Sequence, residues 1–200
     1  MRAVIICGGN AGEYIKKYIQ ADDFIICADS GFDNAKRYGI APNIVIGDMD
    51  SVKCSIDGEN VEIYPTRKDY TDSELAIMYA KDRGYKEIIM LGMTGSRMDH
   101  TLTNLLLLKQ LDGCNACIVD LNNEIYLVNS QISLKGKKGD LVSIIPFEKD
   151  VKITVKGLEY PLSGDVLKAG SSRGVSNVMT GENCTVSAED GPVFVIRSRD

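Results

Sequence analysis

The sequence predicts an α/β fold in which an N-terminal, doubly wound, mostly parallel sheet is followed by a small antiparallel β-sandwich domain. Over residues 1–124, short runs rich in Val and Ile alternate with helical patterns, as in parallel strands buried on both faces. Over residues 125–200, apolar and polar residues alternate with a period of two between Gly and Pro, which is typical of antiparallel strands.

Six segments of the first part have the composition of buried strands. They are residues 3–7, 24–28, 43–47, 61–64, 87–91 and 116–121. The helical patterns between them are clearest over residues 71–83 and 98–111. Strand–helix alternation implies right-handed crossovers, so we expect a Rossmann-like sheet. In the second part, residues 152–155 and 193–196 show the period-two pattern most clearly.

Composition and charge exclude several classes of protein. The 200 residues are 44% hydrophobic and 26% charged, as in an ordinary globular protein. A net charge of −5 without any Lys/Arg run argues against nucleic acid or a membrane surface as partner. No signal peptide or membrane-spanning stretch is visible, so we expect a cytoplasmic protein with reduced thiols. Cys114 and Cys117 form a lone CxxC, which with a single histidine does not favour zinc.

An apolar strand runs directly into two carboxylates over residues 44–51, IVIGDMDS. If the extended backbone persists, Asp48 and Asp50 leave the same face and both reach one hard cation. Gly47 would let a substrate approach the backbone closely. A solvated turn explains the same residues equally well, since Asp, Gly and Ser are common turn formers.

Residues 68–74, KDYTDSE, combine a capping box with further charges. Asp72 falls in the first turn of the helix, where the helix dipole by itself explains a carboxylate. Alternatively, Asp72 joins Asp48 and Asp50 around a cation, and Lys68 supplies positive charge for phosphate.

A third strand end, residues 91–100 or LGMTGSRMDH, leads through a Gly-containing loop into a helix. Backbone N–H groups at that helix start, with Arg97, would make an anion cradle. It is not a P-loop, because GxxxxGK[ST] occurs nowhere in the chain. His100 fits either a general base or a packed or capping helical residue. The turn CGGNAG at residues 7–12 matches GxGxxG only imperfectly, so it gives weak support for a dinucleotide.

Four of these stretches resemble, in order, the motifs of the thiamine pyrophosphokinase family: CADSG at 27–31, IGDMDS at 46–51, KDYTDSE at 68–74 and GSRMDHT at 95–101. The stretch GSSRGVSN at 170–177 resembles that family's segment in the small β domain. The resemblance spans nearly the whole chain, and several motifs in one order are more specific than any one of them.

The resemblance implies transfer of the pyrophosphoryl group of ATP to the hydroxyl of thiamine, giving thiamine diphosphate and AMP. It implies ATP and Mg²⁺ in the catalytic domain (residues 1–124), thiamine in the β domain (residues 125–200), and a homodimer with sites at the subunit interface. Two alternatives stay open: another Mg²⁺-dependent nucleotide-using phosphotransferase, and a nucleotide-sensing module without turnover.

The implied site residues fall into three groups. The metal ligands are Asp48, Asp50, Asp72 and Asp29. The catalytic set is Asp48, Asp50, Asp72, Lys68 and Arg97, and the nucleotide set is Asp29, Lys68, Thr94, Arg97, Asp99 and His100. The thiamine set is Ser172, Ser176 and Asn177. The sequence does not decide whether Asp99 orients Arg97 or contacts the nucleotide.

Overall fold

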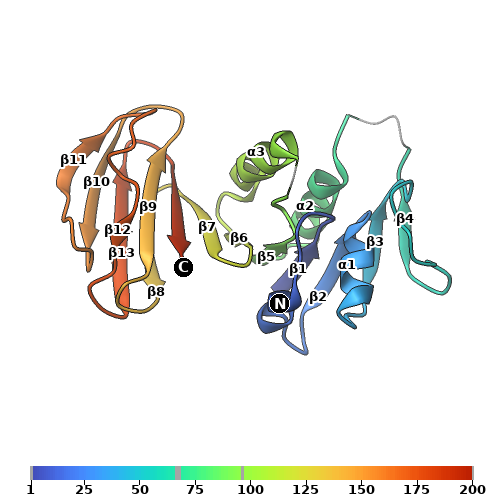
Figure 1. The fold of residues 1–200 in the computed structure, drawn as a ribbon. Coiled ribbons are helices and arrows are strands. Elements are labelled where there is room, and N and C mark those ends of the chain that lie inside the picture. The colour runs from blue at the N-terminus through green and yellow to red at the C-terminus, as the bar shows by residue number, and fades with distance from the viewer. Residues whose placement is uncertain (1, 66–68, 96, 200) are drawn as a thin grey trace. The chain divides into compact units, whose positions relative to one another are not determined.

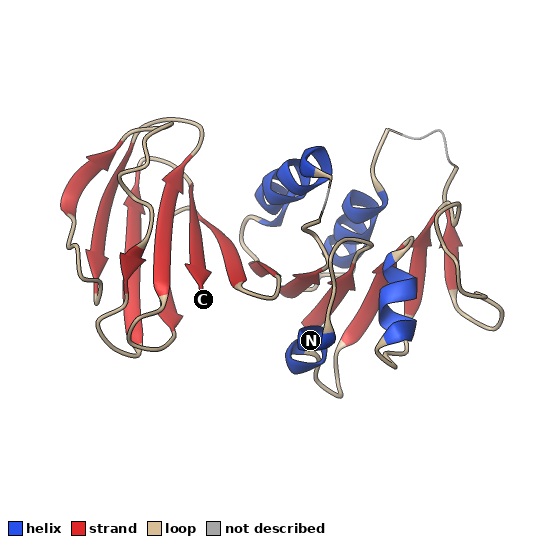
Figure 2. Cartoon of the chain, in the orientation of Figure 1, coloured by secondary structure: helices blue, strands red, loops and turns tan. Residues whose placement is uncertain are grey.

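The computed structural model describes residues 2–65, 69–95 and 97–199. The chain divides into two compact units, Met1–Leu121 and Asn122–Asp200 (Figure 1). The first unit is α/β and the second is all β (Figure 2), so the predicted fold class is confirmed.

The first unit is built on a parallel sheet. Its strands lie in the order β6 (Asn115–Val119), β5 (Glu87–Leu91), β1 (Arg2–Ile6), β2 (Phe24–Ala28), β3 (Ile44–Gly47) and β4 (Val61–Ile63). All neighbouring pairs are parallel, and the predicted strands agree with them to within two residues at each end. The strand order reverses between β1 and β5, and open α/β sheets bind ligands at the carboxyl ends of strands at such a point.

The helices of this unit are α1 (Gly31–Arg37), α2 (Asp72–Asp82) and α3 (Met98–Leu107), with short 3-10 helices η1 (Glu13–Tyr18) and η2 (Leu108–Leu111). The two predicted helices are confirmed, although the second ends in the 3-10 turn η2. Helix α1 was not predicted, because seven residues give little periodicity.

Burial alternates along the strands of the sheet. Val4 and Ile6 pack in one cluster with Phe32 and Ala35 of α1. Ile5, between them, is also fully buried and therefore faces the other side, where α2 packs against β1, β2 and β3. The sheet is covered on both faces, which explains its continuous apolar strands.

The second unit is an antiparallel sandwich. One sheet has the order β12 (Asn177–Val178), β9 (Leu141–Pro146), β14 (Val193–Ser198) and β7 (Asn123–Val128). The other has the order β11 (Ser163–Leu167), β10 (Val151–Lys156), β13 (Asn183–Glu189) and β8 (Gln131–Lys135). Val142 and Ile144 of the first sheet share a core with Ile153 and Val186 of the second.

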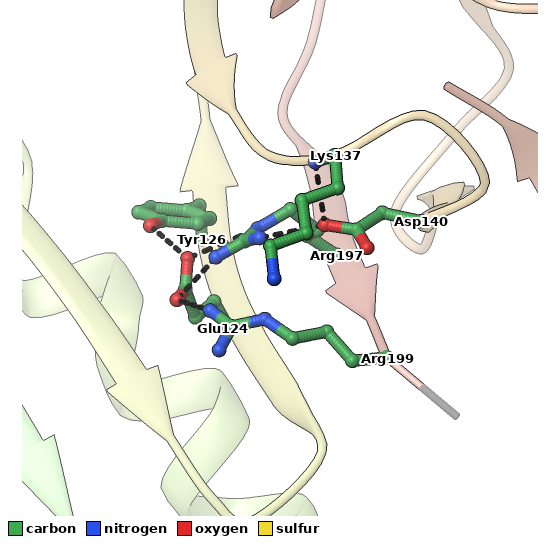
Figure 3. Close-up of polar contacts among 6 residues, drawn as sticks. All are labelled: Glu124, Tyr126, Lys137, Asp140, Arg197 and Arg199. Atoms are coloured by element: carbon green, nitrogen blue, oxygen red, sulfur yellow. Dashed lines mark hydrogen bonds and ion pairs between the residues drawn. The ribbon is translucent and has the colours of Figure 1, made fainter. Parts of the chain in front are cut away.

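A network of charged side chains joins strands β7 and β14 in this unit (Figure 3). Arg197, itself buried, donates to Glu124 at 3.2 Å and to Asp140 at 2.8 Å. Arg199 and the Tyr126 hydroxyl also contact Glu124. Burial alone would raise the pKa of the Glu124 carboxyl, but the hydrogen bond and charge of Arg197 outweigh it and lower that pKa.

All six cysteines are free thiols, as their positions predicted. Within residues 2–65, 69–95 and 97–199, no helix is both long and apolar enough to cross a membrane.

Candidate active site

A cavity of about 560 Å³ opens at the carboxyl ends of strands β1, β2, β3 and β5, where the strand order reverses. Gly9 follows β1, Asp29 follows β2, Asp50 follows β3 and Thr94 follows β5, and all four line the cavity. Asp72, at the start of α2, completes one wall. The volume lies within the range of small-molecule sites, which is roughly 300 to 1,000 Å³.

Three carboxylates meet in this cavity. One oxygen from each of Asp29, Asp48 and Asp50 lies within 4.8 Å of the others. Ligands on opposite sides of one Mg²⁺ are about 4 Å apart, so small adjustments would bring all three to one ion. Oδ1 of Asp29 is buried and has no hydrogen-bond partner among the described residues. A buried anionic oxygen without a partner is costly, so the donor set fits a cation.

The backbone reaches this arrangement through two residues with positive φ. Asp29 has a φ of 46°, and its N–H donates to the Ile46 carbonyl at 2.8 Å. Strand β3 ends at Gly47 and Met49 has a φ of 62°, so of the two possibilities weighed for this stretch, an extended strand and a turn, the structure has the turn. A turn brings the two carboxylates together instead, and such strained residues are common at functional sites.

The cluster is electrostatically unfavourable without a cation. Burial raises the pKa of the Asp29 carboxyl, the neighbouring charges of Asp72, Asp48 and Asp50 raise it further, and the Ser30 N–H opposes them. A divalent ion in the cavity would relieve this repulsion.

Asp72 lies beside the three carboxylates. The Thr71 hydroxyl accepts from the Glu74 N–H at 3.2 Å, which caps α2 as predicted and places Asp72 in its first turn. Asp72 does not belong to the group whose oxygens lie within 4.8 Å of one another, so its role as a ligand stays a prediction. Lys68 lies outside the described residues.

The rim of the cavity carries the predicted anion-binding residues. Arg97 donates to the Asp99 carboxylate at 3.2 and 2.5 Å, and this hydrogen bond lowers the pKa of Asp99 to about 2. The contact with Arg97 is compatible with an orienting role for Asp99, and which of its two possible roles Asp99 has stays a prediction. His100 lines the cavity and is exposed, so it is not a packed helical residue. The Thr94 hydroxyl donates to Asp120 at 3.4 Å.

Two buried amides that the sequence did not reveal hold the cavity loops. Asn34 donates to the carbonyls of Cys7 at 2.9 Å and Gly9 at 3.1 Å. Asn104 donates to the Met93 carbonyl at 2.7 Å. Both asparagines are buried on helices. A buried amide without a hydrogen-bond partner would be costly, and an amide among apolar helix residues was the only signal in the sequence that could have found them.

The predicted thiamine residues lie in the second unit. Ser172 and Ser176 are exposed, and Ser176 has a φ of 59°. Asn177 is buried: its Oδ1 accepts from the Tyr160 N–H at 2.9 Å and its Nδ2 donates to the Tyr160 carbonyl at 2.7 Å. The Asn177 side chain therefore holds the backbone of Tyr160 in place. If Asn177 also contacts thiamine, it would do so through the second N–H of its amide.

Two family models match the chain. Residues 15–119 match the catalytic domain of thiamin pyrophosphokinase, and residues 129–193 match the vitamin B1 binding domain of thiamin pyrophosphokinase.

Relatives with this name match over nearly the whole chain. The thiamine pyrophosphokinase of Bacillus subtilis (strain 168) is 29% identical over 98% of both chains. The crystal structure of the Bacillus subtilis thiamine pyrophosphokinase covers all of both chains with a TM-score of 0.90 and 27% identity. The crystal structure of the Geobacillus thermodenitrificans thiamin pyrophosphokinase gives a TM-score of 0.90 and 27% identity, over all of this chain and 98% of that one.

Proposed function

The chain belongs to the thiamin pyrophosphokinase family, and from that premise we infer that it transfers the pyrophosphoryl group of ATP to thiamine, giving thiamine diphosphate and AMP. The observation that carries this function is the presence of both family domains in one chain. The acidic cavity at the reversal point of the sheet supplies a site suited to a metal-bound nucleotide.

The reaction requires charge neutralisation and alignment more than covalent help from the protein. The hydroxyl oxygen of thiamine forms a bond to the β-phosphorus of ATP while the bond from that phosphorus to the α,β-bridging oxygen breaks. AMP leaves with the electron pair of that bond, and the hydroxyl proton passes to solvent or to a nearby base. His100 lines the cavity and is a candidate for either nucleotide contact or that proton transfer.

We propose that Asp29, Asp48 and Asp50 hold Mg²⁺, with Asp72 beside them. The unpaired buried oxygen of Asp29 and the spacing within 4.8 Å support this assignment. When bound, Mg²⁺ neutralises charge on the phosphate oxygens. Arg97, held by Asp99, is proposed to bind a phosphate oxygen.

The remaining assignments rest on the sequence motifs and, for Thr94, also on its place in the lining of the cavity. We propose that Lys68 binds phosphate, that Thr94 contacts the nucleotide, and that Ser172, Ser176 and Asn177 contact thiamine. We also propose a homodimer with its sites at the subunit interface and a cytoplasmic location, the latter supported by the six free thiols.

Two other functions are less well supported. Another Mg²⁺-dependent phosphotransferase would use the same carboxylates but would not need a vitamin B1 binding domain. A nucleotide sensor would have little use for three clustered carboxylates facing a polyanion without a metal.

Product analysis tests the function directly. The protein is mixed with ATP, Mg²⁺ and thiamine, and the products are identified by mass spectrometry, with an EDTA-treated sample as control. We expect thiamine diphosphate and AMP in equal amounts. ADP accumulating in step with phosphorylated thiamine would show an ordinary kinase instead.

A further inference from the structure

Asp33 of helix α1 holds the loop that carries two of the clustered carboxylates. Its side chain accepts hydrogen bonds from the backbone N–H of Lys53, at 3.1 and 3.0 Å to its two oxygens, and from that of Cys54 at 2.9 Å. The loop leaves strand β3 at Gly47, so these bonds fasten it a few residues beyond Asp50.

The backbone of this loop makes few hydrogen bonds to the rest of the described unit. Residues 48–55 belong to no helix or strand, and within the described ranges no main-chain to main-chain hydrogen bond joins them to the rest of the unit. Met49 and Val52 are partly buried and pack against the apolar cluster of the first unit. The bonds to Asp33 are therefore the hydrogen bonds that fasten the backbone of this loop to helix α1.

The same helix follows another of the clustered carboxylates. Asp29 lies two residues before Gly31, the first residue of α1, and Asp33 lies in the first turn of that helix. Asp33 thus connects the segment that carries Asp29 to the loop that carries Asp48 and Asp50. One carboxylate oxygen of each of these three residues lies within 4.8 Å of the others. Hydrogen bonds from N–H groups to a carboxylate are stronger than neutral ones, which suits such a tether.

We infer that Asp33 is a positioning residue for the metal site: it holds the 48–54 loop so that Asp48 and Asp50 face Asp29. The inference rests on the metal site proposed above. Asp33 does not belong to the cluster itself, so its effect on a metal would act through the loop.

Direct metal binding tests this role without relying on turnover. Mn²⁺ affinity is measured by electron paramagnetic resonance on the full chain and on Asp33→Ala, Asp33→Asn and Asp57→Ala. Asp33→Ala and Asp33→Asn both lose the charge, but only Asn keeps an acceptor for the loop N–H groups. Asp57 is an exposed carboxylate in the segment between strands β3 and β4. It accepts a hydrogen bond from the hydroxyl of the nearby Ser55, so Asp57→Ala controls for the loss of a negative charge.

We expect Asp33→Ala to weaken Mn²⁺ binding about tenfold, as losing such hydrogen bonds implies. Asp33→Asn should stay within about threefold and Asp57→Ala within about twofold of the wild type on the same reasoning. In kinetics, Asp33→Ala should raise the Mg²⁺ concentration needed for half-maximal rate and leave kcat at saturating Mg²⁺ nearly unchanged.

Two results would overturn the inference in distinguishable ways. Unchanged Mn²⁺ affinity in Asp33→Ala would remove the positioning role and leave the metal site standing. Absence of Mn²⁺ binding by the wild type would remove the metal site and this role with it. If circular dichroism shows that Asp33→Ala is unfolded, Asp33→Glu replaces it: the longer side chain displaces the acceptors, and unchanged affinity there overturns the role equally.

Discussion

The carboxylate of Asp72 lies against the backbone of Gly47, because a Cβ built on Gly47 would stand 2.9 Å from Asp72 Oδ1. It would also stand 3.0 Å from the Cβ of Asp29, and the φ of 151° itself disfavours a side chain. The immediate neighbours of this glycine are thus the carboxylate of Asp72 and the β-carbon of Asp29, two of the site residues. We expect Gly47→Ala to displace them and lower kcat/KM roughly ten- to a hundredfold, since small misplacements at a reacting centre cost this much.

Gly58 provides a matched control for that variant. It also has a positive φ, 81°, but a Cβ at this position would meet no atom of the described residues within 4 Å. Steady-state kinetics should show Gly58→Ala near the wild type while both variants keep their circular dichroism spectra. Equal losses in the two variants would mean that backbone strain, not contact with the carboxylates, is responsible.

Asp29→Asn should separate stability from metal binding. The change removes a buried charge whose pKa is raised by burial and by its acidic neighbours, and Asn tolerates the positive φ of 46°. Without metal, we expect a melting temperature a few degrees above that of the wild type. With Mg²⁺, we expect stabilisation of the wild type and much less of the variant. Scanning fluorimetry in EDTA and in Mg²⁺ measures both, and a lower melting temperature in EDTA would contradict the proposed repulsion.

The network around Glu124 should make stability depend on acid pH. Its folded pKa lies below the ordinary value of 4.5, so the stability it contributes is present above that value and is lost as pH falls through the folded pKa. Glu124→Gln should therefore lower the urea midpoint at pH 7, where losing a buried charge partner costs about 3 to 5 kcal/mol. The difference in urea midpoint between Glu124→Gln and the wild type should shrink towards pH 3. An equal difference at pH 7 and pH 3 would show that the stabilisation does not come from an ionised Glu124.

The loop at residues 170–177 should determine the use of thiamine. We expect Ser176→Ala and Asn177→Ala to weaken thiamine use more than ATP binding. Asn177→Ala should also destabilise the protein by about 1 to 3 kcal/mol, because both backbone groups of Tyr160 lose a partner. Kinetics with one substrate varied at a time distinguish these effects: a raised KM for ATP with an unchanged KM for thiamine would assign the loop to the nucleotide.

The sequence predicted the sheet of the first unit well. Parallel strands covered on both faces must be continuously apolar, so segments such as 24–28 and 87–91 could be read with their observed ends. The motif residues at the strand ends line one cavity, because the carboxyl ends of parallel strands meet at one edge of the sheet. Asp48 and Asp50 could be grouped from their spacing, whereas Asp29 was added to them only through the family resemblance.

Contacts between distant residues could not be predicted in this way. The hydrogen bonds that the N–H groups of Lys53 and Cys54 donate to Asp33 span about twenty residues and follow no local pattern. The bracing of Tyr160 by Asn177 is equally non-local. The sequence left a turn and an extended strand open at Met49. The packing of the partly buried Met49 side chain against the apolar cluster, which accompanies the turn, has no short-range signature in the sequence.

The central claim is that the clustered carboxylates hold the Mg²⁺ on which pyrophosphoryl transfer depends. The most direct test measures turnover at limiting Mg²⁺ in Asp48→Asn, Asp50→Asn and Asp72→Asn, each checked for folding, with Asp57→Asn as a charge control. We expect losses of roughly a hundredfold or more in the three site variants, because metal-held charge in the transition state is worth several kcal/mol. Near-normal turnover at limiting Mg²⁺ in Asp48→Asn or Asp50→Asn would contradict the claim, and the same result in Asp72→Asn would remove that residue from the site.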